Sequence, residues 1–558
     1  MGYAKDDPRR LRSGILYTLN QLSDEGHVYA EHDQLIEAAK TLLDAAPENI
    51  DSSLAAMQEV QDVINDEGAI YLPPFYYAEV GIANHLRGLL NTNYASIFDK
   101  KKPDITKISK TTGITYDDVQ VKAIEQACHA KVMVLTGGPG TGKTTTLNGI
   151  IAAYRSVGYD VLLAAPTGRA AKRMSEATGM EAKTIHRLLE YNPADGYKRN
   201  EDNELDGDAL IIDECSMIDT ILMNSLLKAV PPYMRLILVG DIDQLPSVGA
   251  GNVLRDIIDS GVVPVIRLTR IFRQAQTSRI IMNAHAINVG RFPNISNGKQ
   301  SDFFFMSDDN PDHVAMTIVS LVQHRLPTAY HSMRSDIQVL VPMQRGVVGA
   351  ANLNTLLQSA LNPAGPALQR GGYTYRKNDR VMQLRNNYDK NVFNGDIGFI
   401  ENVDTEDRTL KVNFDGKLVD YEVSEFDELT LAYATTIHKS QGSEYPIVIV
   451  PVLFKSYVML QRNLIYTAIT RAKKVCILIG QQRAHRQCHG QQAQYQTERT
   501  VEPSRDNSQP TCKQLRDRST KRRQATEMPP IACHRPHPAC YRSVRRLRNS
   551  RNLISGMH

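Results

Sequence analysis

The stretch Gly137-Gly-Pro-Gly-Thr-Gly-Lys143-Thr144-Thr145 follows an apolar run, Val132 to Thr136, and fits the pattern G-x-x-x-x-G-K-[ST]. A strand, a glycine loop and then a helix form the context that a phosphate-binding loop needs. Glycines let successive backbone N–H groups point at phosphate oxygens, and the helix start adds a positive dipole end. The stretch therefore predicts a nucleoside triphosphate site, against the alternative of a chance glycine turn.

Particular side chains of this loop have predicted roles. Lys143 would bring a full positive charge to the phosphates, and the Thr144 hydroxyl would ligate Mg²⁺. The loop residues that we expect to contact the nucleotide are Gly138, Pro139, Gly140, Thr141, Gly142, Lys143, Thr144 and Thr145.

Two further apolar strands end in polar side chains. The first, Ala209 to Ile212, is followed by Asp213, placed to hold Mg²⁺, and Glu214, placed to polarise the attacking water. Paired acids can also be a solvated strand end. The second strand, Leu236 to Gly240, is followed by Gln244. Its amide could contact the γ-phosphate or the water, or it could be an ordinary loop residue.

Two arginines farther along the sequence complete the set of residues that could act in triphosphate hydrolysis. Arg273 follows Ile271-Phe, and Arg471 follows Tyr466-Thr-Ala-Ile-Thr. An arginine that reaches the γ-phosphate from a second lobe stabilises the charge of the transition state. The alternative for either residue is a surface salt bridge.

The ordered motifs resemble those of superfamily 1 helicases, and among them the RecD-like group that moves 5′ to 3′ on DNA. The resemblance runs from about residue 6 to about 480. It implies two RecA-like lobes with ATP between them and single-stranded DNA across their tops. The matching stretches include Gln120, the glycine loop, 165–171, Asp213-Glu214, 240–244, 272–274, 434–444 and 466–471.

The resemblance also implies roles for single residues. Gln120 would read the adenine edge, and Gly442 and Glu444 would lie near the γ-phosphate and the ribose. Thr167, Arg169, Thr436 and His438 would touch the DNA backbone or couple it to ATP; for His438 the alternative is a packed loop histidine. The predicted ATPase centre consists of Lys143, Thr144, Asp213, Glu214, Gln244, Arg273 and Arg471.

The composition narrows the class of protein. A chain of 558 residues with 42% hydrophobic content has room for three or four globular domains. No apolar run approaches the ~18 residues of a membrane span, and the first residues have no apolar signal core. Seven cysteines without regular spacing are typical of a reducing compartment, so we expect cytoplasm.

The fold class that we predict is α/β, with two RecA-like P-loop lobes. Residues 1–105 would form a helical, winged-helix-like domain in which Tyr71-Leu-Pro-Pro-Phe ends the helices; the alternative is plain scaffold. The first lobe would span 106–262, with 191–206 either a DNA-separating pin or a surface loop. Longer family members carry hairpin modules upstream, so the chain is expected to be a short form or a fragment.

The second lobe would span 263–480 and hold a small β-barrel over about 368–428. Leu410 to Phe414 alternates, and Asp415-Gly416 predicts a tight hairpin turn. The resemblance implies that this insertion helps to enclose the DNA strand. Its alternative role is to fill space between the lobes.

The segment 481–558 differs from the rest. It holds 16 Lys+Arg and 5 Asp+Glu, a net charge of +11, while the other 480 residues have a net charge of −7. Three hypotheses stay open: a disordered basic arm that binds phosphates, a zinc site, or translation in a shifted reading frame. The candidate zinc ligands are Cys488, Cys512, Cys533, His534, His537 and Cys540.

These observations predict an ATP- and Mg²⁺-dependent DNA helicase in repair or recombination, acting as a monomer on single-stranded DNA and on tailed duplexes. Two alternatives remain. A DNA-dependent ATPase or translocase without unwinding would share every motif, and a catalytically inactive remnant would bind DNA only.

Overall fold

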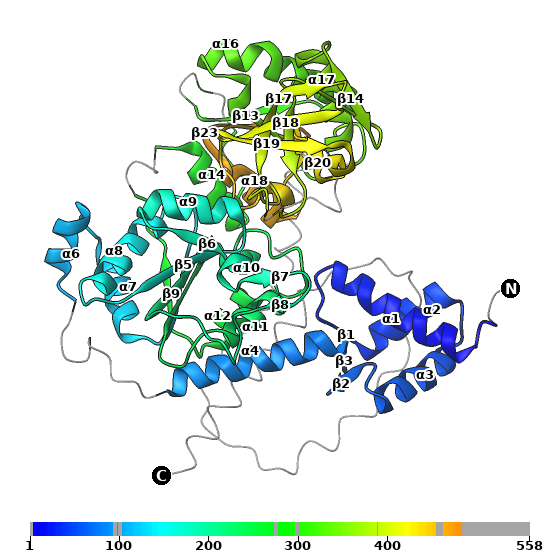
Figure 1. The fold of residues 1–558 in the computed structure, drawn as a ribbon, viewed down its shortest axis with the longest axis vertical. Coiled ribbons are helices and arrows are strands. Elements are labelled where there is room, and N and C mark those ends of the chain that lie inside the picture. Colours follow the sequence, from blue (N-terminus) through cyan, green and yellow to red (C-terminus); the bar gives the residue numbers. More distant parts are fainter. Residues whose placement is uncertain are drawn as a thin grey trace.

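The computed structural model describes residues 4–92, 98, 103–272, 277–295, 298, 301–387, 389–453 and 461–481. Within these residues the chain forms two parallel α/β lobes, an N-terminal module and a small antiparallel β domain (Figure 1). Arg273 and nearly all of the basic segment, with its candidate zinc ligands, lie outside the described residues.

The first lobe is built on a six-stranded parallel sheet in the order β11-β4-β10-β9-β5-β6. Helices cover both faces, which explains why its strands read as continuous apolar runs. Along β4, Val132 and Val134 enter one core while Met133 and Leu135 enter the other. The strands are β4 (Val132–Gly137), β5 (Val161–Ala165), β6 (Ala182–Thr184), β9 (Ala209–Ile212), β10 (Arg235–Gly240) and β11 (Val265–Leu268).

One helix start in this lobe is predicted from the sequence. The helix that follows the glycine loop starts at Lys143, as expected. The described helices are α6 (Ile105–Thr112), α7 (Asp118–His129), α8 (Lys143–Arg155), α9 (Gly168–Thr178), α10 (Ile185–Leu188), α11 (Thr220–Lys228) and α12 (Val253–Ser260). Between α10 and β9, the segment expected to be a pin or a loop contains a short hairpin, β7 (Tyr191–Asn192) with β8 (Gly196–Tyr197).

Both expected boundaries of the first lobe need correction. Strand β11 pairs in parallel with β4, so the lobe continues past residue 262 to Leu268. At the other end, α4 (Pro73–Asn91) contributes Ile82, Leu86 and Leu89 to a first-lobe core. The two prolines after Leu72 begin this helix instead of ending a helical run, because proline is well suited to a first helical turn.

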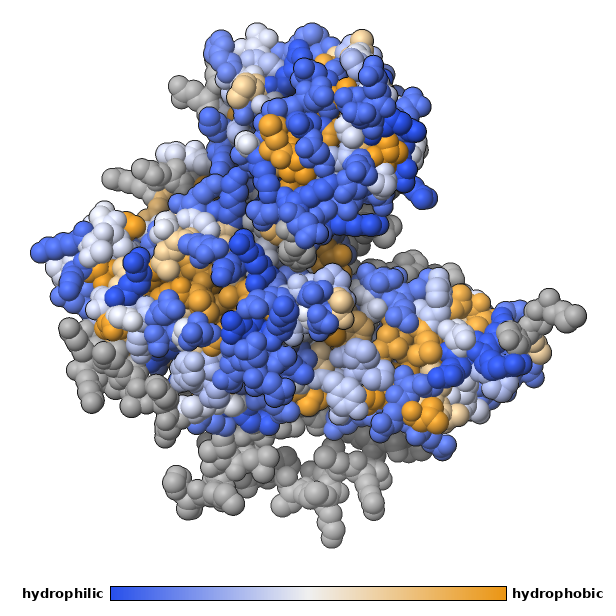
Figure 2. Space-filling view, viewed as in Figure 1, coloured by the Kyte–Doolittle hydropathy of each residue, from blue (hydrophilic) through white to orange (hydrophobic). Residues whose placement is uncertain are grey.

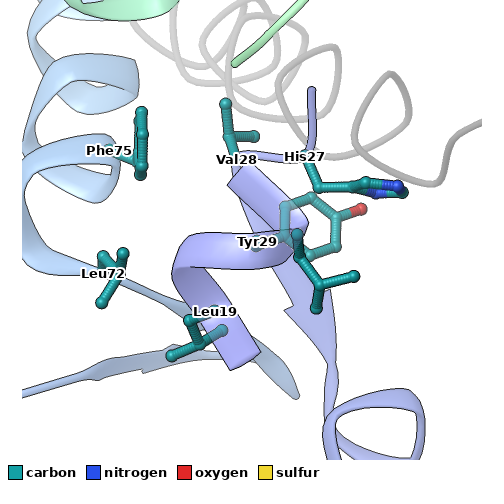
Figure 3. Close-up of a pocket in the computed structure, with 7 residues that line it drawn as sticks. Leu19, His27, Val28, Tyr29, Leu72 and Phe75 are labelled. Carbon is teal, nitrogen blue, oxygen red and sulfur yellow. The ribbon is translucent and has the colours of Figure 1, made fainter. Parts of the chain in front are cut away.

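The N-terminal module has the element order helix, strand, helix, helix, strand, strand, which is that of a winged helix. Its antiparallel sheet has the order β1-β3-β2. A small hollow lies between α1, β1 and the start of α4, and Figure 3 shows residues that line it, among them Leu19, Tyr29 and Phe75. The elements are α1 (Pro8–Asp24), β1 (Tyr29–Glu31), α2 (His32–Leu43), α3 (Pro47–Glu59), β2 (Ile64–Asp66) and β3 (Ala69–Tyr71).

The second lobe is a five-stranded parallel sheet in the order β12-β23-β22-β13-β21. Its two cores lie on opposite faces and meet helices on each side. The strands are β12 (Phe303–Ser307), β13 (Ile337–Val341), β21 (Ala434–Thr436), β22 (Tyr445–Val452) and β23 (Ala472–Gly480). The helices are α14 (Arg279–Asn288), α15 (Pro311–Ser320), α16 (Leu326–Tyr330), α17 (Ala350–Leu361) and α18 (Arg462–Thr470).

A separate β domain is inserted between α17 and β21. Its five-stranded antiparallel sheet has the order β19-β18-β17-β16-β20, and the β14–β15 hairpin shares its core. Asp415 and Gly416 have φ of 52° and 94° and join β18 to β19, as the sequence predicts for a tight turn. The strands are β14 (Ala367–Arg370), β15 (Tyr373–Arg376), β16 (Arg380–Gln383), β17 (Ile397–Asp404), β18 (Thr409–Phe414), β19 (Lys417–Glu422) and β20 (Leu429–Leu431).

The molecular surface is mostly polar on the face drawn in Figure 2, where hydrophobic residues form small groups among hydrophilic ones. Among the described helices, none combines the length and the apolar character that a bilayer crossing requires.

Candidate nucleotide-binding site between the lobes

The phosphate-binding loop lies between β4 and α8. Gly140 and Gly142 adopt left-handed φ values of 71° and 82°, which open the loop at little cost only for glycine. Lys143 begins α8, and its Nζ donates to the carbonyl oxygens of Gly137 at 2.5 Å and Gly138 at 3.1 Å. Thr144 follows on the first turn and is exposed. The loop thus presents a cation, a hydroxyl and a helix N-terminus together.

Gln120 contacts the same loop from α7. The residue is buried, and Asp117 and Gln120 form a reciprocal capping box at the start of this helix. A Cβ added to Gly142 would lie 2.6 Å from Gln120 Nε2 and 2.9 Å from the Phe272 ring. Gln120 is therefore held beside the loop, and its contact with adenine stays a prediction.

The paired carboxylates stand at the carboxyl end of β9. Burial, together with the neighbouring charge of Glu214, raises the pKa of Asp213 to about 6, although Lys143 and Arg173 oppose this shift. Glu214 has a left-handed backbone with φ of 53°, and its N–H donates to Asp213 Oδ1 at 2.8 Å. This backbone directs the two side chains differently although they are adjacent in sequence.

Arg471 reaches Gln244 across the interface between the lobes. Its Nη2 donates to Gln244 Oε1 at 3.0 Å, and its Nη1 to the Ser443 carbonyl oxygen at 3.2 Å. Both side chains are buried, and Gln244 Nε2 donates to Asp241 Oδ2 at 3.2 Å. The structure thus joins the predicted sensing amide to the predicted second-lobe arginine. Arg273, the other predicted arginine, lies outside the described residues.

Glu444 and Gly442 meet the first lobe at α9. A Cβ added to Gly442, which has φ of 70°, would lie 3.0 Å from Thr167 Oγ1. Glu444 Oε1 accepts from Arg173 Nη2 at 2.7 Å. Burial alone would raise the pKa of Glu444, but the charges of Arg173, Arg471 and Lys473 bring it below its usual value.

The four residues predicted to contact DNA lie in two groups. Thr167 caps α9 by accepting from the Ala170 N–H, and Arg169 Nη1 donates to Ser443 Oγ at 2.6 Å and Tyr445 Oη at 3.2 Å. Thr436 ends β21, and His438 follows in a short turn where burial lowers its pKa. Their contacts with DNA stay predictions.

The site also includes residues to which the sequence assigned no role. Tyr466 Oη donates to Asp241 Oδ2 at 2.8 Å, and His285 Nε2 lies 3.3 Å from the Pro139 carbonyl oxygen. A Cβ at Gly138 would meet both His285 and Tyr466. The sequence contained a signal for Asp241 and Tyr466, because both lie within the motifs 240–244 and 466–471. The only signal for Arg173 was its position one helical turn after Arg169.

Three family models match the chain in the order of these elements. An AAA domain covers residues 120–250, an ATP-dependent RecD-like DNA helicase SH3 domain covers 353–414, and a UvrD-like helicase C-terminal domain covers 431–479. The middle match corresponds to α17 and much of the inserted β domain.

Curated relatives align over most of the chain. The ATP-dependent RecD2 DNA helicase of Deinococcus radiodurans is 35% identical over 487 residues, which are 85% of this chain and 66% of that protein. The RecBCD enzyme subunit RecD of Mycobacterium tuberculosis is 31% identical over 454 residues, 74% of this chain and 76% of that protein. The chain belongs to the RecD-like DNA helicases.

Solved structures of Pif1 helicases also align with this RecD-like chain. One, solved for two Pif1 helicases at forked double-stranded DNA, is 19% identical with a TM-score of 0.43, covering 69% of this chain and 98% of that one. The expected fold class is confirmed: two RecA-like lobes carry an SH3-like insertion.

Proposed function

We propose that this RecD-like chain hydrolyses ATP between its two lobes and uses the cycle to move along single-stranded DNA, 5′ to 3′, and to unwind tailed duplexes. The observation that carries the proposal is the Gln244–Arg471 contact, because it links a first-lobe residue beside the phosphate loop to a second-lobe arginine. Hydrolysis would change the contacts that Gln244 makes, and with them the contact between Gln244 and Arg471 that joins the two lobes.

Mg²⁺ fits the residues present. Among the described residues, no group of three His, Cys, Asp or Glu side chains could hold a metal ion. A nucleotide-bound Mg²⁺ needs only one or two protein oxygens, since phosphates and water supply the rest. Thr144 and Asp213 are the residues that would hold it, and the ion would neutralise charge on the phosphates.

The proposed partners are single-stranded DNA and duplexes with a single-stranded tail. A role in repair or recombination, a monomeric state and a cytoplasmic location stay predictions. A translocase without unwinding is the main alternative, because it would use the same lobe interface.

The first experiment measures ATP hydrolysis by the full chain with and without single-stranded DNA. We expect strong stimulation that is lost in Lys143→Ala and retained in Lys122→Ala, which removes an exposed lysine of α7. Unwinding of 5′-tailed but not 3′-tailed duplexes would then support the helicase assignment. Stimulated hydrolysis without strand separation would favour the translocase, and no hydrolysis would contradict the proposal.

A further inference from the structure

Arg173 lies on α9 and contacts carboxylates of both lobes. Its Nη2 is 2.7 Å from Glu444 Oε1, and its Nη1 is 3.7 Å from Glu214 Oε1. Nη1 also donates to the Gly442 carbonyl oxygen at 3.4 Å. A planar guanidinium can hold two acceptors in fixed directions, which a lysine ammonium cannot do. One side chain thus connects the predicted water-polarising carboxylate to the second lobe.

The two carboxylates differ in the number of cations that they contact. Within the described part of the chain, Arg173 is the only side chain paired with the Glu214 carboxylate, which is 13% exposed. Glu444, in contrast, has a second cation, because Lys473 Nζ lies 3.3 Å from its Oε2. Arg173 can therefore be supported from the second lobe while it orients Glu214 in the first.

We propose that Arg173 is a positioning residue for Glu214 and that Glu444 holds it in place, so that hydrolysis depends on the seating of the second lobe. This inference rests on the proposed function. When the second lobe moves away, Glu444 leaves Arg173, and the guanidinium no longer has a fixed direction. Glu214 then loses the group that aligns it toward the attacking water.

A simpler role for Arg173 is a tether that holds the lobes together without affecting the chemistry. The two roles differ in the kinetic constant that they affect. A tether that only holds the lobes around ATP would raise KM for ATP, whereas a positioning residue lowers kcat at saturating ATP.

The test measures kcat and KM for ATP at saturating single-stranded DNA. Lys172→Gln is the matched control, because Lys172 precedes Arg173 on α9 and pairs with Asp415 of the β domain at 2.6 Å. For Arg173→Gln we expect kcat to fall about tenfold with KM changed less than twofold. Arg173→Lys should recover part of the kcat loss, and Lys172→Gln should behave as wild type.

A double variant tests whether Glu444 acts on hydrolysis through Arg173. If Glu444 acts through Arg173, the kcat losses of Arg173→Gln and Glu444→Gln will not multiply when combined. An unchanged kcat in Arg173→Gln would overturn this inference alone, as would kcat losses that multiply in the double variant. Wild-type protein that hydrolyses no ATP would instead overturn the proposed function, and this inference with it.

Discussion

Tyr466 of the second lobe donates a hydrogen bond to Asp241 of the first, with 2.8 Å between Tyr466 Oη and Asp241 Oδ2. Both side chains are almost fully buried, and burial raises the pKa of Tyr466 well above its usual value. The phenol therefore stays a donor throughout the working pH range. Since Asp241 also accepts from Gln244, this contact lies directly beside the predicted sensor.

Replacing Tyr466 with phenylalanine removes that donor and leaves a buried carboxylate oxygen with one fewer partner. We expect the free energy of unfolding to fall by about 1–3 kcal/mol, and DNA stimulation of ATP hydrolysis to weaken. Denaturant unfolding and steady-state hydrolysis measure the two effects. Tyr77→Phe, at an exposed tyrosine of α4, is the control and should change neither. Equal behaviour of the two variants would contradict the prediction.

Gly142→Ala should abolish tight nucleotide binding. An alanine there has a left-handed backbone and a Cβ that would lie 2.6 Å from Gln120 Nε2. Gly158→Ala is a close match, because its φ of 86° imposes similar strain while nothing lies within 4 Å of its Cβ. We expect backbone strain to cost both variants about 1–2 kcal/mol of stability, and Gly142→Ala to lose more because its Cβ also meets Gln120 and Phe272. Only Gly142→Ala should lose affinity for a fluorescent ATP analogue.

Arg471→Lys keeps the charge but loses the planar fork that contacts Gln244 and the Ser443 carbonyl. If Arg471 stabilises the transition state, single-turnover hydrolysis should slow by about 10³-fold or more, with little change in nucleotide affinity. Arg267→Lys, at an exposed position of β11, provides the control. A slowdown of only a few fold would argue that Arg471 mainly supports the lobe interface.

Asp213 gives a pH-dependent prediction. Because its pKa rises to about 6 in the folded protein from 3.8 in the unfolded chain, folding binds its proton more tightly. The resulting stability is present below about pH 4 and is lost as the pH rises through 6. Without nucleotide or Mg²⁺, the free energy of unfolding of Asp213→Asn should therefore exceed that of wild type by about 1–3 kcal/mol at pH 7.5. This difference should shrink toward pH 4.

The control for this prediction is Asp259→Asn on the exposed face of α12. Its stability relative to wild type should not follow the same pH dependence. A gain for Asp213→Asn that is independent of pH would contradict this account.

Asp379 anchors the inserted β domain to the second lobe. Its carboxylate is fully buried and accepts hydrogen bonds from Gln358 of α17 at 2.6 Å, from Asn362 at 2.7 Å and from Tyr433 at 2.9 Å. Asp379→Ala removes an acceptor from all three side chains. Gln358 and Asn362 keep bonds to the Thr374 and Lys377 carbonyl oxygens, whereas Tyr433 Oη loses its acceptor among the described residues. We therefore expect the free energy of unfolding to fall by roughly 1–3 kcal/mol. Limited proteolysis should then cleave the domain faster, whereas Asp404→Ala, at the end of β17, should not be cleaved faster.

Much of the fold could be predicted from local pattern. The glycine loop, the strand before it, the helix start at Lys143 and the Asp415-Gly416 turn all follow from residues within a few positions of one another. The lobe boundary could not, because β11 belongs to the first sheet through its pairing with β4, more than 130 positions earlier. Strand pairing at that distance leaves no local mark on the sequence.

By itself the sequence determined the chemistry: a phosphate loop, paired carboxylates and an arginine of a RecD-like motor. Only the tertiary structure decided which of these groups meet. Arg173 and Glu444 are 271 positions apart and Gln244 and Arg471 are 227 apart, and each pair forms only when the two lobes are seated together. Residue types and spacing specify what a side chain can do, whereas the packing of separately folded lobes decides what it touches.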